Sequence, residues 1–463
     1  MIEREAVGLL GFVALIVLLT LRMPVGLAMV TVGIGGNFAL SIAAPFLRFE
    51  PYLEQFKTLT WGVMANYELS VVPLFILMGF LASYANLSRD LFHGLNGLVG
   101  RVRGGVAMAA IGACAGFGAV CGSSLATAST MGRVALPELA AQGYAPRLAT
   151  GTLAAGGTLG ILIPPSIALV IYAVIVEASI IAMFQAALLP GVLAVVVFLA
   201  VIAFRVTRTP SLAPPPQGLP PAERRAALLR LIPVAAIFGT IIAGLGLGLF
   251  TPTPAAAVGA TIILLYGLGL RLRGPEHGLG LSGLNSALLE TAITSGMIYF
   301  IIFGAEVLKT FFSRSGLPAA LAAWASTSGL DPWLILIGML VILIVLGCMM
   351  ESLSLVLVMV PFFWPVLADL NGGDFVSASN GAFGMTSSEL KLWFGILALV
   401  VVELGLITPP VGLNVFIISA IAKAPKRDVF LGVLPFFAAE LGRVTLILAF
   451  PALALAVPRW LSG

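Results

Sequence analysis

Residues 156–166 read Gly-Gly-Thr-Leu-Gly-Ile-Leu-Ile-Pro-Pro-Ser, and residues 403–414 read Glu-Leu-Gly-Leu-Ile-Thr-Pro-Pro-Val-Gly-Leu-Asn. Each stretch places a double proline inside a long apolar run. Proline lacks a backbone donor and disfavours a helical conformation for the residue before it, so two in succession end a helix. The sequence therefore predicts a broken helix at Pro164-Pro165 and another at Pro409-Pro410.

The surroundings of both breaks are apolar enough to lie in lipid. Hydrophobic residues make up 60% of the 463 residues and charged residues only 10%, whereas a soluble domain carries about 25%. Uncharged gaps such as 104–132 and 231–270 are each long enough for at least one membrane crossing. We therefore predict an all-α, polytopic membrane protein in which each broken helix faces protein or a water-filled cavity.

Charge predicts the orientation of this protein in the membrane. The Pro-rich stretch 205–230 carries five arginines against one glutamate and is predicted to be cytoplasmic. Residues 369–391 carry three acidic residues against one lysine and are predicted to lie outside. Residues 1–5 lack the basic region of a signal peptide, so the apolar run 6–21 is expected to be retained as the first helix.

The two halves of the chain resemble each other. Residues 79–89 (GFLASYANLSR) align with 304–314 (GAEVLKTFFSR), and 160–165 align with 405–410 in the same order. Duplicated halves are common in secondary transporters. We therefore divide the chain into a first membrane repeat at 1–204 with a hairpin near 105–132, a cytoplasmic linker at 205–230, and a second repeat at 231–463 with a hairpin near 317–350.

The two breaks predict binding sites. The helix that ends before the prolines directs carbonyl groups at the gap, which suits Na⁺, and the helix that follows directs N–H groups, which suits a carboxylate. The alternative is a proline kink with a structural role alone. The candidate residues at the breaks are Gly157, Thr158, Pro164, Pro165, Ser166, Thr408, Pro409, Pro410, Gly412 and Asn414.

Two further polar segments lie inside apolar runs. Residues 121–132 are rich in hydroxyl groups, which predicts the tip of a re-entrant hairpin, and tight helix packing by small residues is the alternative. In the second half, Glu351 stands alone between apolar runs, and an ionisable residue inside a membrane is a functional candidate. The candidates here are Gly122, Ser123, Ser124, Thr127, Glu351 and Ser352, with Na⁺ expected near Ser123, Ser124 and Thr408. Glu290, Glu306 and Glu403 are weaker candidates, because each could reach a membrane interface.

Several classes of function find no support in the sequence. No Gly-x-x-x-x-Gly-Lys-Ser/Thr motif is present, so ATP hydrolysis through a P-loop is not expected. With only His93 and His277 as histidines, and cysteines without CxxC spacing, neither a metal centre nor a haem site is expected. The arginines cluster in loops, as the positive-inside rule requires, and do not indicate nucleic-acid binding. A membrane enzyme would need a convergent His, Asp or Glu constellation, for which only Glu351 and Glu403 are available.

Motifs along nearly the whole chain resemble those of one transporter family. In the first half they are Gly122-Ser-Ser, Ala126-Thr-Ala, Met131-Gly, Pro137-Glu138, Gly143-Tyr144, the run 157–166 and Leu189-Pro190-Gly191. In the second half they are Thr251-Pro-Thr, Pro361, Pro365, Trp393-Phe-Gly and the run 404–414. Together they resemble the large membrane subunit of the tripartite ATP-independent periplasmic (TRAP) transporters.

The resemblance implies a multi-component transporter in the bacterial inner membrane. It implies about 12 membrane segments, two of them re-entrant hairpins, in an inverted repeat that works as an elevator. It also implies Na⁺ as the coupling ion, no other cofactor, and no enzymatic activity. The implied partners are a small four-helix membrane subunit and a periplasmic binding protein that delivers a small organic acid.

Two departures from the family pattern and one alternative function remain. The usual Thr-Pro-Thr-Glu is Thr-Pro-Thr-Pro at 251–254, which puts any role of that glutamate in doubt. The loop at 371–388 is longer than in common members, which fits docking of a different binding protein or small subunit. The alternative function is a stand-alone, ion-coupled dicarboxylate or anion transporter that needs no binding protein.

Overall fold

The structure is a computed structural model that describes residues 3–216, 220–246, 249–272, 274 and 278–462, and all regular secondary structure in these residues is helical. His277 lies outside these residues. Within them, seven helices are long and apolar enough to cross a membrane, or nine if two bent helix pairs count as spans. The prediction of an all-α, multi-pass membrane protein is therefore confirmed.

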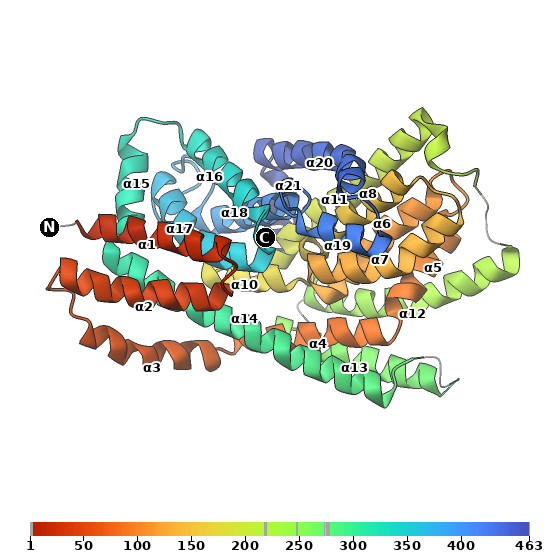
Figure 1. Ribbon diagram of the computed structural model, residues 1–463, viewed down its shortest axis with the longest axis horizontal. Helices are drawn as coiled ribbons and strands as arrows, with labels where there is room; N and C mark the ends of the chain where they lie inside the picture. The colour runs from red at the N-terminus through yellow and green to blue at the C-terminus, as the bar shows by residue number, and fades with distance from the viewer. Residues whose placement is uncertain (1–2, 217–219, 247–248, 273, 275–277, 463) are drawn as a thin grey trace.

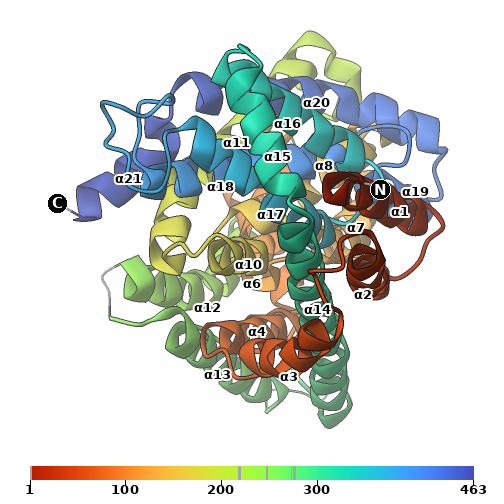
Figure 2. The same cartoon turned by 90° about the vertical axis from the view of Figure 1, so that its left-hand side faces the viewer.

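One group of helices, the α14 layer, is organised around the longest helix. α14 packs against α2, α3 and α4, while α13 packs on α4 and α12 packs on α5. Figure 1 shows α14 running obliquely across the lower half of the molecule, with α3 below its left-hand end, and Figure 2 shows α3, α4 and α13 on the side away from α20. The layer comprises α1 (Arg4–Thr20), α2 (Val25–Ala43), α3 (Glu50–Met64), η1 (Glu68–Ser70), α4 (Val71–Tyr84), α5 (Leu87–Val99), α12 (Pro221–Gly246), α13 (Pro252–Arg271) and α14 (Leu281–Ser315).

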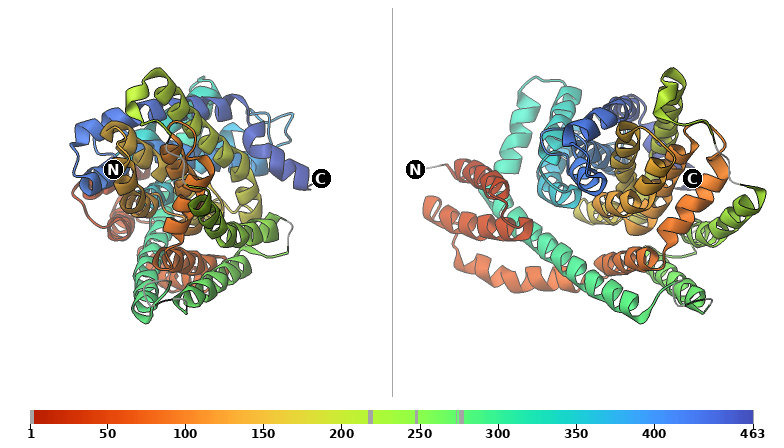
Figure 3. Two further views of the ribbon diagram at one scale, coloured as in Figure 1. Left: turned by 90° about the vertical axis from the view of Figure 1, so that its right-hand side faces the viewer. Right: turned by 45° about the vertical axis from the view of Figure 1, so that its right-hand side comes forward.

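The remaining helices form what we call the core bundle. Its members cluster above α14 in the right-hand view of Figure 3, and α17 is the most deeply buried of the candidate spans. The bundle comprises α6 (Gly105–Cys121), α7 (Ser124–Ala141), α8 (Pro146–Gly157), α9 (Leu159–Leu162), α10 (Ile167–Ile175), α11 (Ile180–Arg208), η2 (Pro210–Leu212), α15 (Leu317–Thr327), α16 (Pro332–Gly347), α17 (Ser352–Leu370), α18 (Ser387–Gly405), α19 (Leu413–Ala422), α20 (Lys426–Ala449) and α21 (Ala452–Ser462).

Both predicted helix breaks are confirmed. α9 ends at Leu162 and α10 begins at Ile167, with the axis bent by 45°. α18 ends at Gly405 and α19 begins at Leu413. Both Pro-Pro bonds are cis. The breaks differ in exposure, since the prolines of the first are buried and those of the second, Pro409 and Pro410, are exposed.

The two broken helices enter the core bundle from opposite ends. At one end, Arg147 at the start of α8 pairs with Asp428 at the start of α20, with 2.7 Å between nitrogen and oxygen. At the other end, the Trp393 indole N–H near the start of α18 donates to the Ile447 carbonyl near the end of α20 at 2.9 Å. α8 and α18 therefore run in opposite directions along α20.

Two helix–turn–helix units accompany the broken helices. α6 and α7 are joined through Gly122, whose φ of 62° is left-handed and favours glycine, and through Ser123. α16 and α17 are joined through residues 348–351. α7 ends beside the start of α8, and α17 ends one loop before the start of α18. The two units therefore also enter the core bundle from opposite ends.

The stretch predicted as a linker, 205–230, is partly helical. α11 extends to Arg208, and α12 begins at Pro221, where the missing N–H is one that a first helical turn leaves unpaired anyway. Arg224 therefore lies on α12, and its side chain donates to the Gly97 carbonyl on α5 at 3.0 Å. Residues 217–219 lie outside the described part of the chain.

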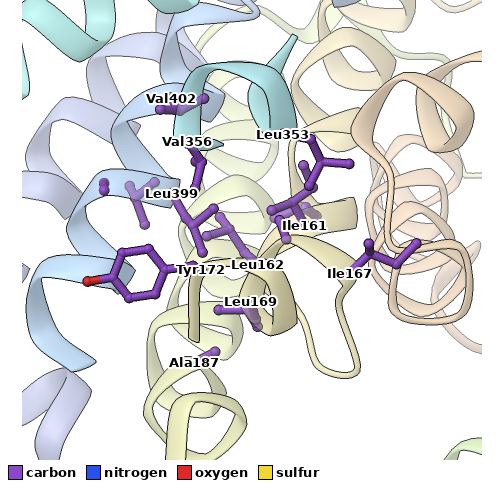
Figure 4. Close-up of a cluster of buried hydrophobic side chains, with 14 of the residues drawn as sticks. Ile161, Leu162, Ile167, Leu169, Tyr172, Ala187, Leu353, Val356, Leu399 and Val402 are labelled. Carbon is purple, nitrogen blue, oxygen red and sulfur yellow. The ribbon is translucent and has the colours of Figure 1, made fainter. Parts of the chain in front are cut away.

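The apolar core of the bundle surrounds the first break. Figure 4 shows Ile161 and Leu162 of α9 facing Val356 of α17 and Val402 of α18. These side chains are 0–1% exposed. In a membrane such side chains contribute through close van der Waals packing, because lipid is as apolar as they are. Packing of this kind holds the broken backbone in place although it lacks helical hydrogen bonds.

Candidate functional site

Glu403 joins the turns of the two helix–turn–helix units. It lies in the last turn of α18, is 2% exposed, and accepts a hydrogen bond on each carboxylate oxygen. The Ser124 hydroxyl donates to Oε2 at 2.5 Å, and the Ser352 hydroxyl donates to Oε1 at 2.7 Å. Ser124 is the first residue of α7 and Ser352 is the first residue of α17. One carboxylate thus contacts equivalent positions in both units.

The residues before these serines cap the same two helices. Ser123 caps α7 by accepting from the Ala126 N–H at 3.4 Å, and Glu351 caps α17 by accepting from the Ser354 N–H at 3.3 Å. A side-chain acceptor at this position satisfies a backbone donor that the first helical turn leaves unpaired. Glu351 also accepts from the Ser354 hydroxyl at 3.3 Å. Glu351 therefore has a structural role as a helix cap.

Each turn packs directly on a helix break. A Cβ atom added to Gly118, in α6, would lie 2.5 Å from Gly160 Cα in α9. A Cβ atom added to Gly160 would lie 2.7 Å from Thr127 Oγ1 and 2.9 Å from the Ser123 carbonyl oxygen. We call this contact the first junction. It brings backbone and hydroxyl oxygens of the α6–α7 turn onto the broken helix.

The second junction repeats this contact. A Cβ atom added to Gly405, in α18, would lie 2.5 Å from the Gly347 carbonyl carbon in α16. The Gly412 N–H donates to the Cys348 carbonyl at 3.3 Å, which ties the second break to the α16–α17 turn. Thr408 lies beside this junction, and its hydroxyl donates to the Leu404 carbonyl at 2.6 Å.

Several buried polar atoms near the breaks have no hydrogen-bond partner in the described part of the chain. They include Thr127 Oγ1, Ser166 Oγ and Asn414 Oδ1, and all three residues are 0% exposed. Asn414 reaches across to the first half, because its amide donates to the Ala154 carbonyl at 3.3 Å. A buried oxygen without a donor is costly unless a ligand completes it.

Two predicted residues at the first break have visible packing roles. A Cβ atom added to Gly157 would lie 2.7 Å from Ala128 Cβ and 3.0 Å from Asn414 Nδ2. The Thr158 hydroxyl donates to the Ala155 carbonyl at 2.7 Å within its own helix. These contacts let α7 and α19 approach α8 closely. Whether either residue also binds a ligand stays a prediction.

A cavity of about 540 Å³ opens beside the two turns. Gly122, Ser123, Glu351 and Ser354 line it from the core bundle, and side chains of α2, α4 and α14 line its other side. Glu351 is the one charged residue among those that line it. The cavity is lined by residues of both turns. Neither Pro-Pro pair is part of its wall.

The weaker carboxylate candidates differ in position. Glu290 accepts from the Tyr84 hydroxyl at 2.7 Å, and Glu306 lies 3.9 Å from Lys309, both within the α14 layer. Glu403 instead occupies the centre of the site. Its sequence signal was its place at the start of the second motif, with no other charge between Lys391 and Lys423. Among the described residues no group of three His, Cys, Asp or Glu could hold a metal ion.

The sequence of this chain matches the model of one protein family. The family model described as "Tripartite ATP-independent periplasmic transporter, DctM component" matches residues 12–453. The chain belongs to this family. It is therefore the large permease component of a TRAP transporter, a multi-pass protein of the inner membrane. The resemblance drawn from the motifs is confirmed.

Curated relatives cover nearly all of this TRAP permease. A C4-dicarboxylate TRAP transporter large permease protein of Pseudomonas aeruginosa is 32% identical over 429 residues, covering 92% of this chain and 94% of the relative. The sialic acid TRAP transporter large permease protein of Vibrio cholerae is 30% identical, covering 87% and 88%. The isethionate TRAP transporter permease protein of Oleidesulfovibrio alaskensis is 26% identical, covering 98% of this chain and 66% of the relative.

Solved structures share the fold at low sequence identity. The Alcanivorax borkumensis YdaH transporter superposes with a TM-score of 0.58 at 16% identity, covering 87% of this chain and 88% of the other. Neisseria gonorrhoeae MtrF superposes with a TM-score of 0.53 at 16% identity, covering 86% and 83%. These likenesses concern the fold alone.

Proposed function

We propose that this TRAP permease imports a small organic acid together with Na⁺, by an elevator movement of the core bundle against the α14 layer. The observation that carries the proposal is the double contact of Glu403, which brings the turns of two oppositely directed helix pairs to one point. Sites of this build, between repeats and at broken helices, are where secondary transporters bind substrate and coupling ions.

The units α6–α7 and α16–α17 are the proposed re-entrant hairpins, so the second proposed hairpin spans 332–370 rather than the region near 317–350 predicted from the sequence. Each turns back at mid-bundle, and the two enter from opposite ends, as expected for an inverted repeat. With α12, α13 and the other candidate spans, they bring the number of membrane segments to about 12. The cytoplasmic end of the bundle is then the one that holds Arg147 and Asp428.

The two junctions fit Na⁺, a hard cation that oxygen ligands suit. At the first junction, the Thr127 hydroxyl and the Asn414 amide oxygen are buried without a hydrogen donor, and the Ser123 carbonyl lies beside Gly160. At the second junction, Thr408 precedes exposed Pro409 and Pro410. Lipid cannot satisfy an exposed broken helix, so this break faces water or another protein. Ions would therefore reach the second junction more readily than the first.

An organic acid suits the cavity between the turns. The relatives named above transport C4-dicarboxylates, sialic acid and isethionate by their names, and all three are organic anions. Among the described residues that line it, the cavity offers no Lys, Arg or His, so positive charge for a carboxylate must come from bound cations and from the starts of α7 and α17. Substrate and Na⁺ binding would then support each other.

The proposal includes a periplasmic binding protein and a small four-helix membrane subunit, which the family implies. The test is uptake into proteoliposomes that contain all three components, compared with uptake when one component is omitted. We expect uptake to require the binding protein and to be nearly absent with this chain alone. Robust uptake by this chain alone would favour the stand-alone anion transporter instead.

A further inference from the structure

Glu403 carries a feature that substrate or ion binding alone does not explain. Each oxygen of its carboxylate accepts from one hydroxyl donor, one donor from each hairpin, and the residue is 2% exposed. Another buried carboxylate of the bundle, Glu440, pairs with Arg443 at 2.6 Å. Hydroxyl groups rather than a cation therefore position Glu403, and both come from residues that begin a hairpin's second helix.

The backbone around Glu403 leaves little room for either hairpin to move independently. Glu403 lies two residues before Gly405, which packs on Gly347 of the second hairpin at backbone contact distance. Displacement of the Ser124 end would break one bond to the carboxylate, and displacement of the Ser352 end would break the other. A side chain shared in this way makes the position of one turn depend on the position of the other.

We propose that Glu403 is a positioning residue that couples the two hairpins, so that occupation of one Na⁺ junction favours occupation of the other. This inference rests on the proposed Na⁺ coupling. The residues next to Ser124 and Ser352, namely Ser123 and Glu351, line the substrate cavity. Coupling through Glu403 therefore also links both ion junctions to the cavity wall. Coupling between sites is a free energy, and it shows as cooperativity in binding.

The test measures the Na⁺ dependence of uptake in proteoliposomes that contain the complete transporter. The variants are Ser124→Ala and Ser352→Ala, which each remove one donor, and Glu403→Gln, which keeps the shape and loses one acceptor. We expect a Hill coefficient above about one for the native protein and a fall towards about one in each variant. The double variant Ser124→Ala/Ser352→Ala should lower it no further than either single change.

Two controls separate coupling from packing. Ser295→Ala removes a buried hydroxyl of α14 that has no hydrogen-bond partner among the described residues, and Ser419→Ala removes a buried hydroxyl that donates to the Ala424 carbonyl just beyond the end of α19 at 2.7 Å. Both should keep the native Hill coefficient, even where the melting temperature falls. If the serine variants melt earlier yet keep the native Hill coefficient, Glu403 is only a packing residue and the inference is overturned.

The outcomes also separate this inference from the proposed function. Native uptake that ignores Na⁺ would overturn the proposed function and the coupling with it. Native uptake that depends on Na⁺, with unchanged cooperativity in Ser124→Ala and Ser352→Ala, would overturn the coupling alone. If Glu403→Gln fails to fold, the two serine variants still test the coupling, because they leave the Glu403 carboxylate in place.

Discussion

Gly347 and Gly405 meet so closely that a Cβ atom on Gly405 would lie 2.5 Å from the Gly347 carbonyl carbon. Gly118 and Gly160 meet in the same way in the first half, at 2.5 Å from Cβ to Cα. In both halves, small residues let the first helix of a hairpin touch the helix that ends at the double proline. The hairpin turns are placed at the breaks by these backbone contacts.

Gly405→Ala should therefore destabilise the protein, because backbone atoms at this distance cannot move aside. We expect a loss of about 1–3 kcal/mol, the usual cost of overpacking. The measurement is thermal unfolding in detergent. Gly338→Ala is the matched control, since Gly338 lies in α16 with nothing within 4 Å of its added Cβ. A control as unstable as Gly405→Ala would contradict the account.

Thr408→Val and Thr127→Val test the two proposed Na⁺ junctions, because at the first junction the oxygen without a hydrogen-bond partner among the described residues is the Thr127 hydroxyl, whereas the Ser123 hydroxyl caps α7. Each change removes one oxygen with little change of shape, so the Na⁺ concentration for half-maximal uptake should rise. A lost ligand costs on the order of 1–3 kcal/mol, or roughly five- to hundredfold in affinity. Uptake should be measured beside detergent melting curves. Normal Na⁺ dependence with poorer folding in both variants would support a packing role instead.

Arg443→Met tests the buried pair on α20. Arg443 also donates to the Pro190 carbonyl of α11 at 3.1 Å, so its loss leaves Glu440 without its cation and α11 without this contact. Removal of one partner of a buried pair costs about 3–5 kcal/mol. The double variant Glu440→Gln/Arg443→Met should recover part of the stability. Melting temperatures that show no recovery would mean that packing dominates over charge at this site.

Single cysteines test the orientation. Phe375 is fully exposed in the loop after α17, and Arg427 is exposed at the start of α20. We expect a membrane-impermeant maleimide to label Phe375→Cys in intact cells and Arg427→Cys only after permeabilisation. The native protein is the background control, because its cysteines are buried or half-buried. Labelling of both variants from the same side would contradict a membrane crossing by α18 and α19, which lie between these two positions.

The broken helices and the all-α class could be predicted because proline and apolar length act locally. Pro164 and Pro409 remove backbone donors whatever surrounds them, and the structure breaks helices at both. The central role of Glu403 could not be predicted in this way. Its partners lie 279 and 51 residues away in the chain, and a lone carboxylate near a motif also fits a membrane interface.

The roles of the glycines and of Asn414 likewise depend on contacts between the halves. Gly160 and Gly405 resemble the other glycines of the chain in sequence. Only the packing shows that a Cβ atom at either position would meet backbone atoms. Asn414 belongs to the second motif, yet its amide contacts Ala154 in the first half. The 205–230 stretch is predicted to be a linker because it is rich in proline and arginine, although Pro221 begins a helix.

The central claim is that Na⁺ drives uptake through this permease. The most direct measurement is substrate accumulation in proteoliposomes that contain the permease, the small subunit and the binding protein, with Na⁺ supplied only outside. We expect accumulation without ATP and its loss when K⁺ replaces Na⁺. Equal accumulation in K⁺, with no proton gradient present, would contradict the account.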